Sequence, residues 1–225
     1  MIFNSCKFVT MEKDLGSYRK SYEKSELLLN DTPENPLALF RAWFDEVDEH
    51  FPEDETNAMT LSTIGLNGFP KNRVVLLKKI TSEGFIFYTN YESEKGKAIA
   101  KNPKVCLSFF WAGAERQIII KGKAEKIAKK LSDGYFKSRP RGSQLGAIVS
   151  QQSHIIENRD LIESKLIALE KEFEGKEITR PDYWGGFIVK PVSIEFWQGR
   201  PNRLHDRIYY IFNEKDFWVK NRLAP

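Results

Sequence analysis

Apolar and polar residues alternate along most of the chain with the period of β-strands, interrupted by stretches with the period of helices. Strand-like runs occur at residues 58–64, 73–80, 85–89, 105–111, 117–124, 186–190, 194–197, 208–212 and 217–219. A first helix is expected to begin at Pro36, because asparagine is a good N-cap and proline suits the first helical position. Further helices are expected at 93–101, 126–138 and 159–174. The pattern predicts a mainly β protein with peripheral helices.

The connections between the strands favour an antiparallel barrel over a doubly wound parallel sheet. Asn67-Gly68 is a good turn dipeptide between the first two strands, and Ala112-Gly113-Ala114 joins two later ones. Neither GxGxxG after a first strand nor GxxxxGK[ST] occurs. Any phosphate that binds here must therefore be held by side chains.

Composition narrows the class of protein further. The 225 residues are 41% hydrophobic, which is enough for a packed core, and residues 1–34 are expected to form an arm before a domain at 35–225. The net charge of +4 is too small and too scattered to indicate nucleic-acid binding. No apolar run is long enough to span a membrane. Two cysteines without CxxC, and three histidines without ligand spacing, predict a reduced, cytoplasmic protein without a metal.

The densest candidate chemistry lies between Trp197 and Arg207, directly after an apolar run. This segment contains three arginines, one histidine, one aspartate and one tryptophan within eleven residues. Arginine offers a planar fork of donors to phosphate, tryptophan offers a stacking face, and histidine can move a proton near neutral pH. A solvated basic loop is the alternative, but the combination favours a pocket for a flat anion. Arg203 and His205 would point the same way in an extended segment.

Other candidate cations lie at the ends of elements. Arg73 and Lys78 should point to opposite faces of one strand unless a bulge intervenes, and ordinary strand-end charge is the alternative. Lys95 lies at the start of the expected helix that Ser93 begins, a suitable place for an anion. Tyr135, Arg139 and Ser143 recur every four residues, although Pro140 should interrupt a helix there. Converging donors for a phosphomonoester and a simple helix terminus are equally compatible with this spacing.

Eleven collinear segments together resemble the pyridoxine/pyridoxamine 5′-phosphate oxidase family. They are residues 73–78, 87–90, 115–117, 122–125, 135–140, 143–147, 152–153, 183–187, 194–199, 203–207 and 222–225. The resemblance implies an antiparallel FMN-binding split β-barrel, active as a homodimer with FMN in the cleft between subunits. It also makes residues 1–34 a mobile arm, of which Arg19 and Tyr22 are carried over as substrate contacts.

The resemblance also implies roles for individual residues. The implied FMN contacts are Arg73, Val74, Val75, Leu76, Leu77, Lys78, Tyr88, Thr89, Lys95, Gln117, Gln152, Ser153, Trp197 and Arg207. The implied substrate contacts are Lys78, Tyr135, Arg139, Ser143, Arg203, Leu204 and His205, in addition to Arg19 and Tyr22. Arg203 and His205 would be the catalytic pair, closing over the substrate and orienting it.

The reaction implied by the resemblance is oxidation of pyridoxamine or pyridoxine 5′-phosphate to pyridoxal 5′-phosphate. A hydride would pass from C4′ to flavin N5, and O2 would reoxidise the flavin to give H2O2, with ammonia released from the amine. One departure is Glu94, where many family members carry a basic residue. Because a carboxylate would repel the FMN phosphate, we expect Glu94 to turn to solvent and FMN to bind more weakly.

Two other functions remain open at this point. A related flavin oxidase of phenazine-type biosynthesis would share the barrel and much of the FMN site, although the set Lys78, Tyr135, Arg139 and Ser143 argues against it. A non-catalytic carrier of FMN or pyridoxal phosphate would use the same binding groups. Peroxide production separates the carrier from an oxidase, and turnover of pyridoxine phosphate separates the two oxidases.

Overall fold

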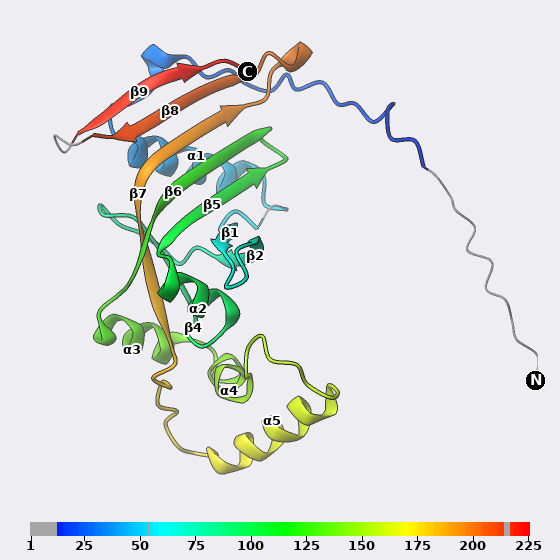
Figure 1. Cartoon of the computed structure of the whole chain (residues 1–225), viewed down its shortest axis with the longest axis vertical. Helices are drawn as coiled ribbons and strands as arrows, with labels where there is room; N and C mark the ends of the chain where they lie inside the picture. The colour runs from blue at the N-terminus through cyan, green and yellow to red at the C-terminus, as the bar shows by residue number, and fades with distance from the viewer. Residues whose placement is uncertain (1–12, 54, 214–216) are drawn as a thin grey trace, which may run out of the picture.

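The structure is a computed structural model that describes residues 13–53, 55–213 and 217–225 (Figure 1). Its described part contains nine strands, all paired antiparallel in one curled sheet. They are β1 Ala58–Ile64, β2 Pro70–Leu76, β3 Lys79–Ile80, β4 Phe85–Asn90, β5 Lys104–Trp111, β6 Arg116–Lys126, β7 Trp184–Gln198, β8 Asp206–Phe212 and β9 Trp218–Leu223. The helices are α1 Pro36–His50, α2 Glu94–Lys101, α3 Lys129–Ser138, α4 Arg141–Val149 and α5 Asp160–Glu172, with short 3-10 turns η1 Leu29–Asp31 and η2 Pro201–Arg203. The predicted mainly β, antiparallel, barrel-like architecture is confirmed.

The sheet order is β2-β1-β5-β6-β7-β4-β3. In addition, β8 pairs with β7, and β9 pairs with β8. β7 is the longest strand, with 15 residues, and it pairs with β6 and β4 as well as β8. The sequence pattern predicted two strands there, separated at Pro191. The strand instead continues through proline with a register shift opposite Lys121 and Gly122, since a bulge lets a strand bend without ending.

Two other expectations about elements need correction. The strand expected at 73–80 begins earlier, at Pro70, and is divided into β2 and β3 because Leu77 and Lys78 leave the ladder. Residues 141–149 form a separate helix, α4, which was not among the expected helices, although an interruption at Pro140 was expected.

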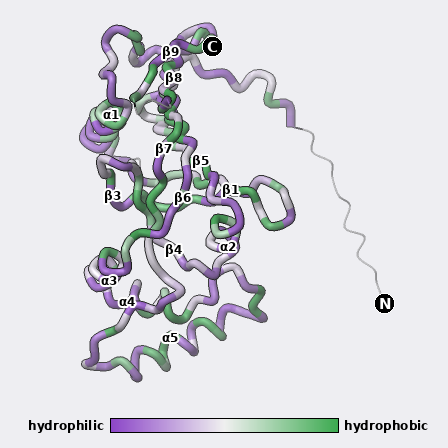
Figure 2. The backbone as a smooth tube through the Cα atoms, turned by 60° about the vertical axis from the view of Figure 1, so that its left-hand side comes forward, coloured by the Kyte–Doolittle hydropathy of each residue, from purple (hydrophilic) through white to green (hydrophobic). Residues whose placement is uncertain are grey.

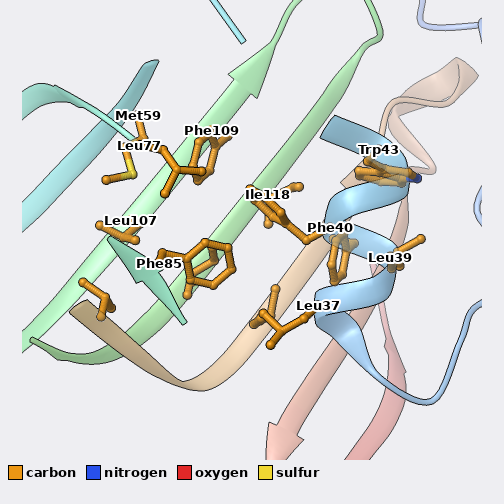
Figure 3. Close-up of a cluster of buried hydrophobic side chains, with 14 of the residues drawn as sticks. Leu37, Leu39, Phe40, Trp43, Met59, Leu77, Phe85, Leu107, Phe109 and Ile118 are labelled. Carbon is orange, nitrogen blue, oxygen red and sulfur yellow. The ribbon is translucent and has the colours of Figure 1, made fainter. Parts of the chain in front are cut away.

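The main core lies between α1 and the inner face of the sheet (Figure 3). Asn35 caps α1 by accepting a hydrogen bond from the Leu37 amide at 2.9 Å, as expected. Phe40 on α1 is fully buried, with ring centroids 4.8 Å from Phe85 and 5.2 Å from Phe109. This packing fixes the start of β4, a strand whose other end lines the site described below.

A smaller apolar cluster holds the other end of the molecule. Its buried members are Phe136 of α3, Leu145 of α4, Trp184 of β7 and Ile178, which lies between α5 and β7. One side of α5 packs against them. Figure 2 shows these three helices at the end away from β8 and β9, with hydrophobic and hydrophilic residues alternating along α5. The cluster therefore attaches α3 and α4 to the start of β7.

The N-terminal segment is partly attached to the barrel. Leu27 is buried in the main core, its amide donates to the carboxylate of Asp206 at 3.0 Å, and its carbonyl accepts from Arg222 at 2.8 Å. The mobility expected of residues 1–34 stays a prediction, and residues 1–12 lie outside the described part. Within that part, no helix has the length and apolar character needed to cross a bilayer.

Candidate active site

A cationic pocket of about 870 Å³ lies between β2, β4 and the start of α2 on one side and α3 and α4 on the other. Most residues predicted to contact a phosphate or flavin line it. These are Arg73, Val74, Val75, Leu76, Lys78, Tyr88, Thr89, Lys95, Tyr135, Arg139, Ser143, Gln152 and Ser153. We call this pocket, with all of its lining residues, the cationic pocket below. Leu77 differs, because its side chain is buried in the main core rather than in the pocket wall.

Arg73 and Lys78 both line this pocket, although strand alternation placed them on opposite faces. The break after Leu76 removes the alternation, so Lys78 turns back toward the pocket. Arg73 is oriented by β1, since its Nη1 donates to the Leu61 carbonyl at 3.0 Å and to Thr63 Oγ1 at 2.8 Å. The two cations can therefore serve one anionic ligand or two adjacent ones.

Tyr135, Arg139 and Ser143 converge on the pocket from both sides of the interruption at Pro140. α3 ends just before Arg139 and α4 begins just after Pro140, which confirms the predicted break. The Tyr88 and Tyr135 rings stack with centroids 3.9 Å apart, and the Arg139 guanidinium lies 4.6 Å from the Trp184 ring. Arg139 Nη1 is buried and has no hydrogen-bond partner among the described residues. A buried donor of this kind calls for an acceptor, and an anion bound in the pocket would supply one.

Lys95 is the pocket cation whose pKa is most altered. Burial lowers the pKa of its ammonium to about 8, and the nearby charge of Arg73 contributes in the same direction. Its Nζ donates to Gln152 Oε1 at 2.9 Å, and it lies in the first turn of α2, which Ser93 caps as predicted. An anion bound beside Lys95 would raise this pKa, because a nearby negative charge favours the ammonium.

Glu94 was expected to turn to solvent, and its side chain is indeed 39% exposed, although it still contributes to the pocket lining. It lines the rim and accepts a hydrogen bond from Lys71 Nζ. That hydrogen bond and the charges of Lys71, Arg73 and Lys95 hold the pKa of the Glu94 carboxyl below its usual range. The charge of the Glu94 carboxylate is thus balanced by Lys71 of β2. The effect of Glu94 on FMN affinity stays a prediction.

A second pocket, of about 620 Å³, lies at the far end of β7. Its lining residues are Tyr18, Arg19, Lys20, Ser21, Tyr22, Arg200, Asn202, Arg203 and His205, which we call the arm pocket. The predicted substrate contacts Arg19, Tyr22, Arg203 and His205 come together here. Leu204, also predicted, is exposed and outside the lining set.

The segment around Arg203 and His205 is not extended as assumed. η2 occupies residues 201–203, and both Asn202 and Arg203 have left-handed backbone, with φ of 55° and 62°. His205 still faces the same pocket as Arg203. Its ring lies 4.6 Å from the Trp197 ring, and its Nδ1 accepts a hydrogen bond from the Arg200 amide at 3.0 Å. That contact leaves the proton of the neutral ring on Nε2.

Three predicted FMN contacts form a row across the sheet. Gln117 on β6 is paired with Trp197 on β7, which is paired with Arg207 on β8. Directly opposite residues share a face, and these three are half-exposed, whereas Ile118, Phe196 and Ile208 beside them are buried. Arg207 is held by Glu195 at 2.8 Å. The row therefore lies on the outer face of the sheet, apart from the cationic pocket.

Several lining residues were missed by the sequence analysis. Trp184 stacks under Tyr88 with centroids 5.5 Å apart, and Lys71 pairs with Glu94 at the rim. The signal for Trp184 was its place before Gly185-Gly186: a Cβ on Gly186 would lie 2.9 Å from the Tyr88 ring, so glycine is required for this packing. Lys71 had no signal, because its partner is on a different element.

Comparison with solved structures gives the class of protein. PhzG from Burkholderia lata 383, in complex with tetrahydrophenazine-1-carboxylic acid, superposes with a TM-score of 0.82 at 25% identity, covering 90% of this chain and 100% of that one. A pyridoxamine 5′-phosphate oxidase-related, FMN binding protein from Nostoc punctiforme gives 0.68 at 15% identity, covering 85% and 98%. The fold is that of the split-barrel proteins.

Sequence comparison defines the family. Residues 45–171 match the pyridoxamine 5′-phosphate oxidase family, and residues 184–225 match the pyridoxine 5′-phosphate oxidase C-terminal dimerisation region. A pyridoxine/pyridoxamine 5′-phosphate oxidase of Flavobacterium psychrophilum is 64% identical, covering 95% of this chain and all of the relative. One of Christiangramia forsetii is 53% identical, covering 96% and 100%. The chain belongs to the pyridoxine/pyridoxamine 5′-phosphate oxidase family and is an enzyme of that family.

Proposed function

We propose that the protein oxidises pyridoxamine 5′-phosphate or pyridoxine 5′-phosphate to pyridoxal 5′-phosphate, with FMN as cofactor and O2 as electron acceptor. H2O2 is the second product, and the amine substrate also releases ammonia. The observation that carries the proposal is the cationic pocket, in a chain that is 64% identical to a curated oxidase over nearly its whole length. The phenazine-type alternative is less favoured, since the sequence identity to PhzG is only 25%.

The side chains of the cationic pocket fit phosphate groups. Arg73, Lys78, Lys95 and Arg139 supply four cations, and the one carboxylate among the described lining residues, Glu94, is paired with Lys71. In our proposal, Arg73 and Lys95 hold the FMN phosphate. The substrate phosphate is held by Lys78, Tyr135, Arg139 and Ser143, and the free Arg139 Nη1 is one of the donors to it.

When bound, FMN would accept a hydride from the substrate C4′ and pass the electrons on to O2. The chain itself positions the substrate. Arg203 and His205 close over the ring, and the Nδ1 contact with the Arg200 amide makes His205 a donor through Nε2. Burial and the charge of Arg203 lower the pKa of His205, which favours the neutral ring at pH 7. Orientation of this kind can supply much of a rate enhancement.

A complete site in this proposal requires two copies of the chain. The cationic pocket includes Trp184 at the start of β7, and the arm pocket begins just after Gln198 at its end. A strand of 15 residues spans up to about 45 Å if straight, and Figure 1 shows that the two ends of β7 lie far apart although the strand bends, so we infer that one small substrate does not contact both pockets of one chain. A homodimer resolves this by bringing the arm pocket of one subunit to the cationic pocket of its partner, with FMN at the interface.

The decisive experiment is a visible absorbance spectrum of the purified protein without oxygen, before and after addition of pyridoxamine 5′-phosphate. A flavin spectrum that bleaches on addition and returns with air, with release of peroxide, is expected. A flavin spectrum that does not bleach would indicate a carrier or another substrate. Failure to bind added FMN would contradict the proposal.

A further inference from the structure

The arm pocket depends on a segment without regular structure. Residues 18–22 contribute five of its nine lining residues, yet they lie in neither helix nor strand. Figure 1 shows the N-terminal segment, in dark blue, approaching the barrel near the orange turn that precedes β8. A side chain of the barrel must therefore fix its position, and the contacts of Glu115 identify that side chain.

Glu115 lies in the tight turn between β5 and β6, with left-handed backbone at φ 58°. Its side chain is only 3% exposed. A non-glycine residue in this conformation persists where the surroundings require it. A carboxylate this deeply buried also needs compensating donors, and those donors come from the N-terminal segment.

Three groups of the segment converge on this carboxylate. The amides of Glu23 and Lys24 donate to Oε2 at 2.8 and 3.1 Å, and Lys20 Nζ lies 3.5 Å from Oε1. Lys24 is held a second time, since its Nζ donates to the Gly113 carbonyl at 2.6 Å. These contacts join residues about ninety positions apart along the chain, so they determine where the segment crosses the barrel.

The same residue also fixes the opposite wall of the pocket. The carbonyl of Glu115 accepts from the Gly199 amide at 2.8 Å, at the end of β7. Tyr22 packs on this glycine, where an added Cβ would lie 2.7 Å from the tyrosine Cβ. The Tyr22 ring then meets Trp197 edge-on at 5.7 Å and lies 6.0 Å from His205. One residue thus sets the distance between the segment and the loop of Arg203 and His205.

We propose that Glu115 is a positioning residue, which docks residues 18–24 over the Arg203–His205 loop and so completes the substrate end of the site. The role toward substrate rests on the proposed function, whereas the docking itself does not. A second attachment, from the Leu27 amide to Asp206, is independent of Glu115. Loss of the Glu115 carboxylate should therefore free the amides of residues 23 and 24 and loosen residues 18–22, while residues 27–32 stay in place.

Hydrogen exchange of the FMN-loaded protein tests the docking directly. Glu115→Gln keeps the shape of the side chain and removes its charge, and Glu115→Ala removes both acceptors. We expect faster exchange at the amides of residues 23 and 24, by about tenfold in Glu115→Ala, with no change at Leu27. Glu23→Gln is the matched control, because its exposed carboxylate accepts from Ser21, within the part of the chain that the structure describes, while its amide still reaches Glu115. Unchanged exchange at residues 23 and 24 in Glu115→Ala would overturn the docking.

Steady-state kinetics with pyridoxine 5′-phosphate test the positioning role. The KM of Glu115→Ala should rise about tenfold while the FMN Kd stays within about twofold, because the cationic pocket is untouched. Lys20→Gln, on the segment itself, should raise KM in the same direction but less, since this lysine is largely exposed. Faster amide exchange in Glu115→Ala with an unchanged KM would overturn the positioning role. If the wild-type protein turns over no substrate, the proposed function fails while hydrogen exchange still decides the docking.

Discussion

Among single residues, Lys95 should give FMN binding a distinct pH dependence. Its pKa of about 8 in the free protein means that the ammonium is lost as pH rises through that value. A bound phosphate favours the ammonium, so FMN affinity should fall above about pH 8, by up to about tenfold per pH unit. The Kd from flavin fluorescence at several pH values measures this. Lys95→Arg keeps its charge and should remove the decline, and identical profiles for the two proteins would disprove this account.

Glu94 allows a second prediction at the residue scale. Its carboxylate pairs with Lys71 at the pocket rim, so Glu94→Arg removes a negative charge, frees Lys71 and adds a cation near the proposed FMN phosphate site. We expect FMN to dissociate several-fold more slowly from this variant. Lys71→Gln is the matched change and should accelerate dissociation. Unchanged or weaker FMN binding by Glu94→Arg would refute the expectation.

Arg203 and His205 should affect the reaction more than the retention of cofactor. Both line the arm pocket rather than the cationic pocket, so neither is expected to hold the FMN phosphate. Arg203→Ala and His205→Asn should each slow flavin reduction in anaerobic stopped-flow measurements by about 10²-fold or more, as expected for lost positioning. Their FMN Kd should change little. Loss of FMN before loss of reduction rate would mean that the two residues contact the cofactor.

Among the elements, α2 positions Lys95, and Gly96 fixes α2. A Cβ on Gly96 would lie 2.2 Å from the backbone oxygen of Tyr91. Gly96→Ala should therefore destabilise the fold by about 1–3 kcal/mol and weaken FMN binding, because the helix start must shift. Gly134→Ala in α3 is the control: no atom lies within 4 Å of its added Cβ, and the same change should stabilise by about 0.5–1 kcal/mol. Urea unfolding of both variants measures the difference, and equal effects would contradict the packing argument.

Most elements could be read from the sequence, because their signals are local. The cap formed by Asn35, the apolar face of α1 and the hairpin at Asn67-Gly68 depend on residues a few positions apart. The errors lie where partners far along the chain decide the outcome. β7 continues through Pro191 because its extra residue, Val192, forms a bulge opposite Lys121 and Gly122 of β6, and β2 ends at Leu76 because Leu77 enters the core.

For the whole molecule, the separation of the two pockets predicts complementation between subunits. Arg139→Gln should disable the cationic pocket and Arg203→Ala the arm pocket, each alone reducing activity about 10²-fold or more. In a mixed population refolded together, half of the dimers carry both variants, and each has one intact shared site. About a quarter of wild-type activity should return if the dimer is symmetric. Each variant refolded alone is the control, and no recovery would place the whole site within one chain.

The sequence by itself determined the type of most elements, with α4 as the main omission, and the identity of most lining residues of the cationic pocket. Those signals are short-range periodicities, caps and segments shared with a family, all of which lie along the chain. Only the tertiary structure decided which residues meet. It brought Arg73 and Lys78 into one pocket, paired Glu94 with Lys71, and placed Glu115 under the N-terminal segment. It also separated Arg203 and His205 from the cationic pocket by the length of β7. The physical reason is that these contacts depend on strand breaks, register and packing among distant segments, which local patterns do not encode.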